Sequence, residues 1–412
     1  MIRRLLSRLA LLCALAVALP ALAQDRAAIE RQFQSWLQKD VWPAARAKGV
    51  SRATFERAMG GVRLNWDLPD LVPPGSKATT PKRQTQSEFG APGRYFRGVS
   101  GDASIGRQLA SRHASTLARI EQQTGVPSRI LLGIWGRESA YGRAKIPHNV
   151  FEVLGTKGFM ATRARYFREE LIAALQIAEA GHTSGPLRSS WAGALGQPQF
   201  MPSSFLQYAT DGDGDGRADI WGSVPDTLAS IANYLSRHGW VAGRDWGFEV
   251  SVPASVSCSL EGPDQGRPIT EWEAMGITRV SGRPFPDHER NGEGFLMMPA
   301  GRNGPAFVVT PNFYVLKDYN MSDLYALYVG HVGDRIQYGV GDFTAPWGAV
   351  GKMYRSDIAA MQRSLEGMGH DVGGADGLPG FKTRRSIGRW QEATGQPATC
   401  FPEPGMKAQL VR

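Results

Sequence analysis

The sequence has only three cysteines among 412 residues and, beyond its first two dozen residues, no apolar run long enough to cross a bilayer. It lacks the HExxH, GxSxG, P-loop and CxxC motifs, and its seven histidines are scattered without metal-ligand spacing. These absences exclude a disulfide-stapled miniprotein and count against zinc hydrolases and serine esterases. With 42% hydrophobic residues, 49 Gly and 26 Pro, the composition is typical of a globular protein of two or three domains.

Residues 1–23 have the pattern of a secretory signal peptide: three arginines, an apolar stretch, and a small-x-small cleavage site that ends at Ala23. Cys13 lies within the apolar stretch and follows a leucine, so the pattern predicts a soluble periplasmic protein and not a lipoprotein. Cys258 and Cys400 are the remaining thiols. In an oxidising compartment they could pair, and two unpaired thiols fit the sequence equally well.

The charge of the chain is diffuse. Loss of the three signal arginines reduces 47 Lys+Arg to 44, which against 38 Asp+Glu leaves a net charge of +6. No basic helix or Lys/Arg block stands out, so the sequence does not indicate nucleic-acid binding, whereas an anionic wall polymer is a suitable partner.

Four segments differ in pattern ahead of residue 340. Residues 26–60 read as a short helical start, and residues 67–104, rich in Pro, Gly, Ser and Lys, predict an extended segment. From Ile105 apolar residues recur at helical spacing and predict a mostly α core over 105–340. Within it, residues 247–315 carry Val and Phe among Gly and Pro, which indicates short inserted strands.

Glu138 is the conspicuous carboxylate of the chain. Ser128 is expected to cap a helix in which Ile130, Ile134 and Glu138 share one face, so the carboxylate lies on an apolar stripe near the helix end. Desolvation and the partial negative charge of that end both raise its pKa, as a general acid for a glycosidic oxygen requires. The alternative is an ordinary ion pair with a neighbouring cation, for which the candidates are Arg137, Arg143 and Lys145.

A second stretch, SSWAGALGQPQFMPSS over residues 189–204, combines small residues with Ser190 and Gln199. Small residues allow backbone and sugar to approach closely, and these two side chains offer hydrogen bonds for hydroxyl and acetamide groups. A tight connection between helices is the alternative interpretation.

Together these stretches resemble the lytic murein transglycosylases of the membrane-bound transglycosylase B type. The resemblance spans roughly residues 85–340 and rests on several motifs in the same order. The motifs are GIWGRESAYG (133–142), RARYFREEL (163–171), SWAGALGQPQFMPSSFLQYATDGDGDGRADIW (190–221), LASIANYLSRHGW (228–240) and NFYVLKDYN with Ser322 and Tyr325.

The resemblance implies a mainly α fold, a lysozyme-like α+β catalytic core with inserted short strands, and Glu138 as the single catalytic acid/base. Core packing is the alternative for each tyrosine, Tyr234 above all. Residues 151–162 depart from the alanine-leucine-rich helix that the family has at this place along the glycan groove. The residues that the resemblance places along the glycan groove are Ser190, Gln199, Tyr234, Tyr319, Asn320 and Tyr325.

The implied activity is cleavage of the β-1,4 bond between N-acetylmuramic acid and N-acetylglucosamine in peptidoglycan, with a 1,6-anhydro product and no cofactor for the chemistry. A hydrolytic muramidase and a non-catalytic peptidoglycan-binding scaffold are the alternatives. No membrane span is expected, and any protein partners in wall synthesis are unknown.

The segment DGDGDGRADIWG (211–222) follows the calcium-loop pattern, with a glycine at position 6. Position 12 is Gly222 in place of a bidentate carboxylate, and Asp226 lies too far along to replace it without a different loop path. The sequence predicts a weak structural Ca²⁺ site, and a solvated acidic turn is the alternative. The expected ligands are Asp211, Asp213, Asp215, Asp219 and the carbonyl of Arg217.

Residues 341–351 predict a linker, and residues 352–412 a compact module. One helix carries Ile358 and Gln362, an Asp-Gly turn follows, and Thr383 opens a helix with Ile387 and Gln391. This pattern resembles a small three-helix peptidoglycan-binding module.

Overall fold

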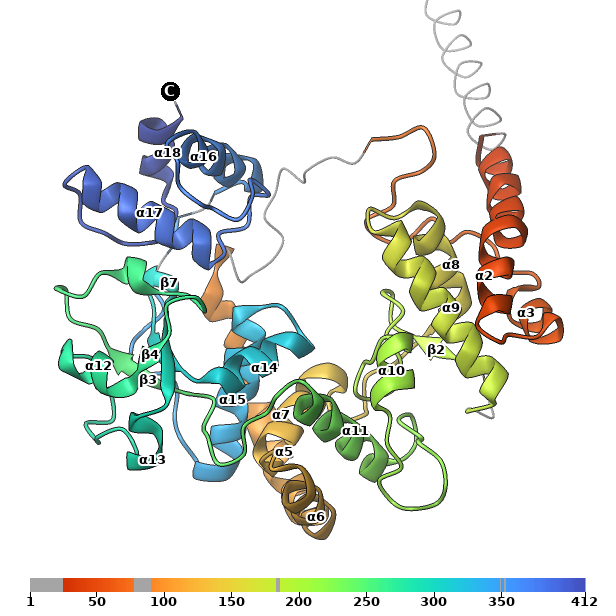
Figure 1. Ribbon diagram of the computed structural model, residues 1–412, viewed down its shortest axis with the longest axis horizontal. Coiled ribbons are helices and arrows are strands. Elements are labelled where there is room, and N and C mark those ends of the chain that lie inside the picture. The colour runs from red at the N-terminus through yellow and green to blue at the C-terminus, as the bar shows by residue number, and fades with distance from the viewer. Residues whose placement is uncertain (1–24, 78–89, 183–185, 349, 352, 412) are drawn as a thin grey trace, which may run out of the picture. The chain divides into compact units, whose positions relative to one another are not determined.

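The computed structural model describes residues 25–77, 90–182, 186–348, 350–351 and 353–411, so the predicted signal peptide lies outside the described residues. The chain forms two compact units, residues 1–78 with 143–227 and residues 79–142 with 228–412, which are described separately. Both units are mainly helical, as the sequence predicted (Figure 1). No helix of the described residues is long and apolar enough to cross a membrane.

The first unit is built around α8 (Val150–Met160) and α9 (Ala164–Ala180), which pack against each other. The predicted helical start is confirmed: residues 25–36 are helical, and α3 follows the turn after residue 47. α8 is buried on nearly every side, which explains why its sequence is apolar without an amphipathic stripe. The other elements are η1 Leu37–Val41, α2 Trp42–Ala47, α3 Arg52–Met59, β1 His148–Asn149, β2 Arg188–Ser189, α10 Pro202–Tyr208 and the start of α11 Val224–Arg237.

The second unit has a helical centre in which α7 packs against α5 and α15. A Cβ at Gly133 of α7 would lie 2.7 Å from the carbonyl oxygen of Val329, so glycine lets α7 and α15 approach closely. α5 begins at Val99, so residues 99–104 are helical and not extended as expected. The helices are η2 Pro92–Phe96, α5 Val99–Arg112, α6 Ala114–Thr124, α7 Ser128–Ser139, α14 Pro311–Tyr319 and α15 Asp323–Tyr338.

The predicted strands of residues 247–315 form a five-stranded antiparallel sheet in the order β4-β6-β8-β3-β5. Phe248 pairs with Val308 at its centre, and the buried Trp272 packs in the core cluster beneath it. The elements are β3 Gly247–Ser251, η3 Cys258–Leu260, β4 Arg267–Pro268, α12 Ile269–Ala274, β5 Thr278–Arg279, α13 Asp287–Arg290, β6 Glu293–Met297, β7 Pro299–Arg302 and β8 Ala306–Val309.

The described residues of the predicted linker, 341–348 and 350–351, are irregular, and aromatic side chains of this segment pack on the core. Phe343 stacks on His331 with ring centroids 4.1 Å apart, and Trp347 stacks on Phe96 at 5.3 Å. The domain boundary stays a prediction, yet these contacts show that this segment does not act as a free tether.

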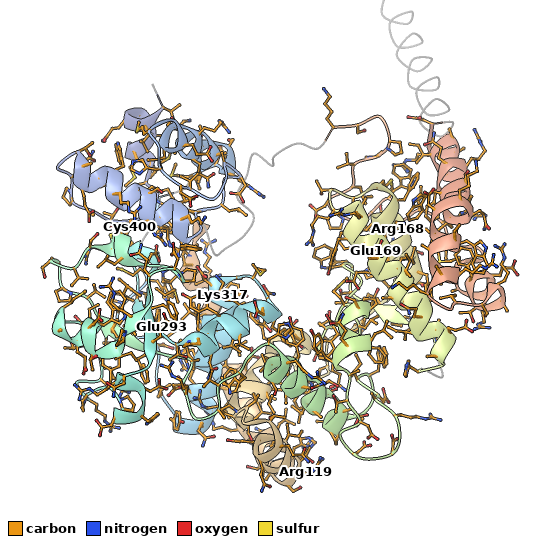
Figure 2. The ribbon with its side chains drawn as sticks, in the orientation of Figure 1. Arg119, Arg168, Glu169, Glu293, Lys317 and Cys400 are labelled. Atoms are coloured by element: carbon orange, nitrogen blue, oxygen red, sulfur yellow. A yellow bond between two sulfur atoms is a disulfide. The ribbon has the colours of Figure 1, made fainter. Side chains whose placement is uncertain are left out.

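The C-terminal module is covalently joined to the sheet region, because Cys258 and Cys400 form a disulfide (Figure 2). Gly388 is required beside it, since a Cβ there would lie 2.2 Å from the Cys400 sulfur. Of the two alternatives left open by the sequence, the structure shows pairing. The helices of the module are α16 Arg355–Gly367, α17 Phe381–Ala393 and α18 Pro404–Leu410.

Reducing the Cys258–Cys400 bond is expected to destabilise the second unit. The bond closes a loop of 142 residues, and loss of that constraint on the unfolded chain corresponds to at most about 5 kcal/mol. Urea unfolding of the oxidised and the reduced protein measures the difference. The double Cys258→Ser, Cys400→Ser variant is the control that should not respond to reductant, and equal stability of both wild-type forms would contradict the prediction.

Candidate functional site

The start of α7 is held by a neighbouring helix. The Glu121 carboxylate accepts hydrogen bonds from the backbone N–H of Ser128 at 2.9 Å and from its Oγ at 2.6 Å. Pro127 occupies the N-cap position and makes no side-chain cap. The expectation that Ser128 caps the helix is therefore wrong, because Ser128 is the first helical residue and its hydroxyl donates to Glu121 instead of accepting from a helix N–H.

The end of α7 turns sharply directly after Glu138. Ala140, Tyr141 and Gly142 are all left-handed, with φ of 50°, 60° and 77°. Such backbone is costly for non-glycine residues, and the Tyr141 hydroxyl stabilises it by donating to the Asp102 carbonyl at 2.7 Å. The strained turn ends the helix at the point where the carboxylate leaves it.

Glu138 is half-buried, but protein atoms surround its carboxyl group closely enough that desolvation raises its pKa to about 7. Tyr325 and Arg137 favour the ionised form and oppose the shift without cancelling it. Among the described residues Glu138 forms no ion pair, and no second carboxylate of this unit is among the groups that shift its pKa. The structure thus supports the acid hypothesis over the ion-pair alternative.

Two of the predicted groove residues, Tyr325 and Tyr319, lie beside this carboxyl group, and Tyr234 contacts Tyr319. Tyr325 is 1% exposed. Its hydroxyl lowers the pKa of Glu138, but it forms no regular hydrogen bond within the described residues. Tyr319 stacks parallel to Tyr325 with centroids 6.3 Å apart, and Tyr234 meets Tyr319 edge-on at 4.8 Å. The negative charge of Glu138 adds to burial in raising the pKa of Tyr319 and Tyr325, so both hydroxyls stay protonated donors.

The other groove predictions in this unit are engaged differently. The Tyr234 hydroxyl donates to the Asp318 carbonyl at 2.7 Å, which ties α11 to the end of α14. Asn320 ends α14, is exposed, and accepts from the backbone N–H of Ser322 at 3.3 Å. Ser322 in turn caps α15.

Sequence reasoning considered Arg137 only as an ion partner, whereas its guanidinium lies over the rings of Tyr95 at 4.3 Å and Tyr328 at 4.8 Å. Tyr328 is fixed by a hydrogen bond from its hydroxyl to the Asp102 carboxylate. This aromatic support keeps a positive charge beside Glu138 without neutralising it. In the sequence, the only signal for this role is that Arg137 directly precedes Glu138 in the motif GRES (136–139).

Ser190 and Gln199 belong to the first unit, where both shape one loop. The Ser190 Oγ accepts from the backbone N–H of Ala194 at 3.1 Å, and Gln199 Nε2 donates to the Gly196 carbonyl at 2.8 Å. Gln199 has a φ of 54°, a strained conformation for this residue type. Their place in a groove with Glu138 stays a prediction.

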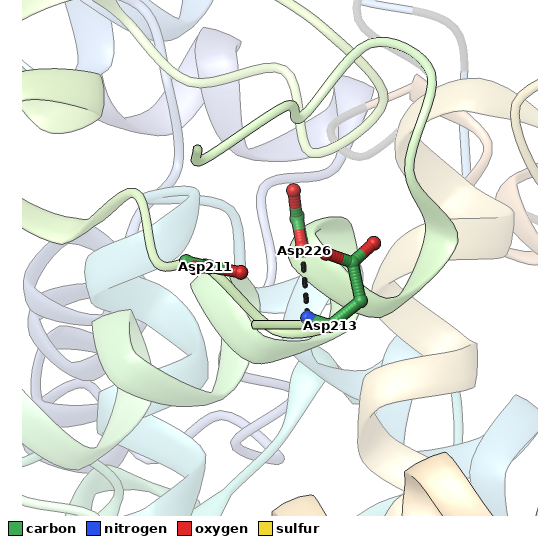
Figure 3. Close-up of side chains that lie close together, drawn as sticks. All are labelled: Asp211, Asp213 and Asp226. Atoms are coloured by element: carbon green, nitrogen blue, oxygen red, sulfur yellow. Dashed lines mark hydrogen bonds between the residues drawn. The ribbon is translucent and has the colours of Figure 1, made fainter. Parts of the chain in front are cut away.

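The acidic loop gathers a different set of carboxylates from the predicted one. Ligand oxygens of Asp211, Asp213 and Asp226 lie within 4.8 Å of one another (Figure 3). The prediction that Asp226 is too distant is wrong, because the loop folds back and Asp226 accepts from the backbone N–H groups of Gly212 and Asp219.

Two predicted ligands lie outside this group. The Asp215 carboxylate accepts from the backbone N–H of Arg217, and the Asp219 carboxylate accepts from those of Trp221 and Gly222. Both side chains therefore shape the loop and are not directed toward the three gathered carboxylates.

A carboxyl group whose pKa desolvation raises to about 7 suits the general acid of an enzyme that cleaves glycosidic bonds. The model of the Transglycosylase SLT domain family matches residues 32–334, which is well over half of the chain. The chain therefore belongs to this family, which confirms the resemblance.

One curated relative is the membrane-bound lytic murein transglycosylase B of Escherichia coli (strain K12), 34% identical over 237 residues. The match covers 55% of this chain and 61% of that relative, less than two thirds of its length.

Two solved structures bear on the site. SltB3 from Pseudomonas aeruginosa in complex with NAG-anhNAM-pentapeptide matches with a TM-score of 0.82 and 36% identity, over 92% of this chain and 99% of that chain. The Escherichia coli lytic transglycosylase Slt35 in complex with calcium matches with a TM-score of 0.52 and 31% identity, over 62% and 80%.

Glu138→Gln is expected to change how stability depends on pH. Folding raises the pKa of Glu138 from 4.5 to about 7, so between these values the folded state binds more protons and wild-type stability falls as pH rises. Glutamine does not titrate, so the variant does not lose this stability as pH rises. Urea unfolding should show that the stability difference in favour of the variant grows from pH 5 to pH 8, and a difference independent of pH would contradict the raised pKa.

Proposed function

We propose that the protein is a lytic transglycosylase that cleaves the β-1,4 bond between N-acetylmuramic acid and N-acetylglucosamine in peptidoglycan and forms a 1,6-anhydro-muramic acid end. The observation that carries the proposal is the carboxyl group of Glu138, whose pKa of about 7 no carboxylate among the described residues of its unit shifts. Family membership supports it, as does the anhydro-muramoyl peptide named in the complex of SltB3.

In the proposed reaction Glu138 first donates its proton to the bridging glycosidic oxygen as the bond to C1 breaks. The resulting carboxylate then takes the proton of the muramic acid C6 hydroxyl as that oxygen bonds to C1, which regenerates the acid. Ordinary glycosidases need two carboxylates at set separations. Here the nucleophile belongs to the substrate, so a single group with a pKa near the working pH suffices.

The tyrosines support both halves of this cycle. The buried Tyr325 hydroxyl has hydrogen-bonding capacity that no described residue uses with good geometry, so it can steady the carboxylate between the two proton transfers. We further propose that Tyr319, Tyr234 and Asn320 line the glycan groove, together with Ser190 and Gln199 of the first unit.

We also propose that the protein is exported to the periplasm and cleaved after Ala23, and that its C-terminal module binds peptidoglycan. The signal pattern of the sequence supports the first statement, and the three-helix pattern of residues 352–412 the second. The residues that define the module pattern are structural: Gln362 is fully buried and binds Thr383 at 3.0 Å.

Glu138→Gln is expected to abolish release of anhydro-muropeptides from purified sacculi while the protein stays folded and binds sacculi. The variant keeps the shape of the side chain but removes its titrating proton. Mass analysis of the products measures the effect and separates the alternatives, since a hydrolase would give reducing ends. Substantial turnover by the variant would exclude Glu138 as the acid/base.

Calcium is proposed as a structural ion held by Asp211, Asp213 and Asp226, with the Arg217 carbonyl as a further donor. Burial raises the pKa of Asp226, and the charge of Asp213 adds to this, while hydrogen bonds from backbone N–H groups only partly offset the rise. A divalent cation would stabilise the ionised carboxylates. The calcium in the Slt35 complex supports the proposal. The ion would hold the loop and supply no chemistry.

Millimolar calcium is expected to raise the melting temperature of the wild type relative to chelator, because an ion that binds only the folded state stabilises it by mass action. Asp226→Asn should remove the shift. Asp219→Asn, which keeps the oxygen that accepts from Trp221 and Gly222, is the matched control that should retain it. A wild-type melting temperature indifferent to calcium would leave the loop an acidic turn.

A further inference from the structure

One arginine of the C-terminal module reaches into the catalytic core. Arg384 of α17 has a side chain that is 2% exposed. Its Nε donates to Glu261 at 2.8 Å, and its Nη2 donates to Glu261 and to Asp323, each at 3.1 Å. Its Nη1 donates to the Pro379 carbonyl at 3.0 Å. Four of the five N–H groups of the planar guanidinium thus donate hydrogen bonds, and such a group fixes the geometry of its partners.

Asp323, one of these partners, is the first residue of α15. Its Oδ1 accepts from Lys317 of α14 at 2.6 Å, while Oδ2 accepts from Arg384. Burial raises the pKa of Asp323, but Lys317 and Arg384 together outweigh it and hold the pKa below its usual range. Asp323 is therefore an ionised bridge between the end of α14, the start of α15 and the C-terminal module.

The turn that this bridge fixes carries the tyrosines of the site. Tyr319 is the last residue of α14, and Tyr325 follows Asp323 by two positions in the first turn of α15. The backbone N–H of Tyr325 donates to the Ser322 cap at 3.2 Å. A shift of the first turn of α15 would move the Tyr325 hydroxyl relative to Glu138.

We propose that Arg384 is a positioning residue of the catalytic site: through Asp323 it holds the first turn of α15, and thereby Tyr325, against Glu138. The C-terminal module is then a part of the catalytic apparatus and more than a wall-binding attachment. This inference rests on the proposed role of Glu138 as acid/base.

The next residue provides a matched control. Arg385 lies on the same helix and at the same boundary, but its guanidinium pairs with Asp264 and its Nε donates to the Glu261 carbonyl. It makes no contact with α15 in the described residues. Loss of Arg385 should weaken the attachment of the module without moving Tyr325.

Removing Arg384 alone would leave Glu261 buried without its partner, so the test uses Arg384→Met combined with Glu261→Gln. Glutamine keeps the oxygen that accepts from the Met298 N–H at 3.1 Å. Thermal unfolding first establishes that the variant is folded. We then expect kcat on soluble glycan fragments to fall about tenfold or more, as misplacement of a site group does.

The pH profile separates a positioning role from a merely structural one. Tyr325 lowers the pKa of Glu138, so its displacement should raise that pKa and move the high-pH limb of the profile to higher pH. Tyr325→Phe should move the limb in the same direction. Arg385→Met combined with Asp264→Asn should leave both kcat and the limb close to those of wild type.

The inference is wrong if the folded Arg384 variant keeps the wild-type kcat and the wild-type position of the high-pH limb. It is also wrong if the Arg385 variant loses as much activity and shows an equal shift of that limb. A fall in kcat with an unmoved limb also contradicts it, because that result indicates a general loss of structure. Glu138→Gln, assayed alongside, distinguishes the failures: activity there overturns the proposed function, whereas an inactive Glu138→Gln with a neutral Arg384 variant overturns only the inference.

Discussion

The site depends on the free-energy cost of ionising one carboxyl group inside a helical core. Desolvation raises the pKa of Glu138 to about 7, and every neighbouring feature keeps the group in that environment. Gly133 lets α15 approach α7 closely, and the left-handed turn at Ala140 and Tyr141 ends the helix where the carboxyl group projects. An exposed carboxylate at the same position would be ionised and useless as an acid at neutral pH.

The surroundings keep this cost within limits. Tyr325 and Arg137 favour the ionised form. In the proposed reaction this lets the group give up its proton and recover it. Arg137 is held over two aromatic rings and forms no ion pair with Glu138. A direct ion pair would lower the pKa and remove the acid, whereas a purely apolar pocket would keep the group permanently protonated.

The sequence predicted what depends on local periodicity and missed what depends on tertiary contacts. The spacing of Ile130, Ile134 and Glu138 correctly predicted a helix that carries the carboxyl group next to its C-terminal end, because helical periodicity can be read from local sequence. The cap assigned to Ser128 was wrong, because Pro127 occupies the N-cap position and the Ser128 hydroxyl donates to Glu121 of the neighbouring helix. The sequence placed Asp226 too far along to replace position 12 without a different loop path, and the loop takes such a path by folding back on itself.

The C-terminal module illustrates the same limit. Its sequence pattern predicted a separate wall-binding unit, and motif residues such as Gln362 and Thr383 prove to hold the module's own turn. Nothing in the pattern of helical faces indicates that Arg384 would be buried against Asp323, since that contact joins residues 61 positions apart. A tertiary contact between Arg384 and Asp323, which local propensity does not encode, connects the module to the site.

The most direct test of the account is titration of the Glu138 carboxyl group itself, by difference infrared spectroscopy of the wild type against Glu138→Gln. The account predicts a protonated carboxyl band that disappears with a midpoint near pH 7 and is missing from the variant. A difference spectrum in which the carboxyl group is already ionised at pH 5 would contradict it, because a group with an ordinary pKa could not serve as the acid.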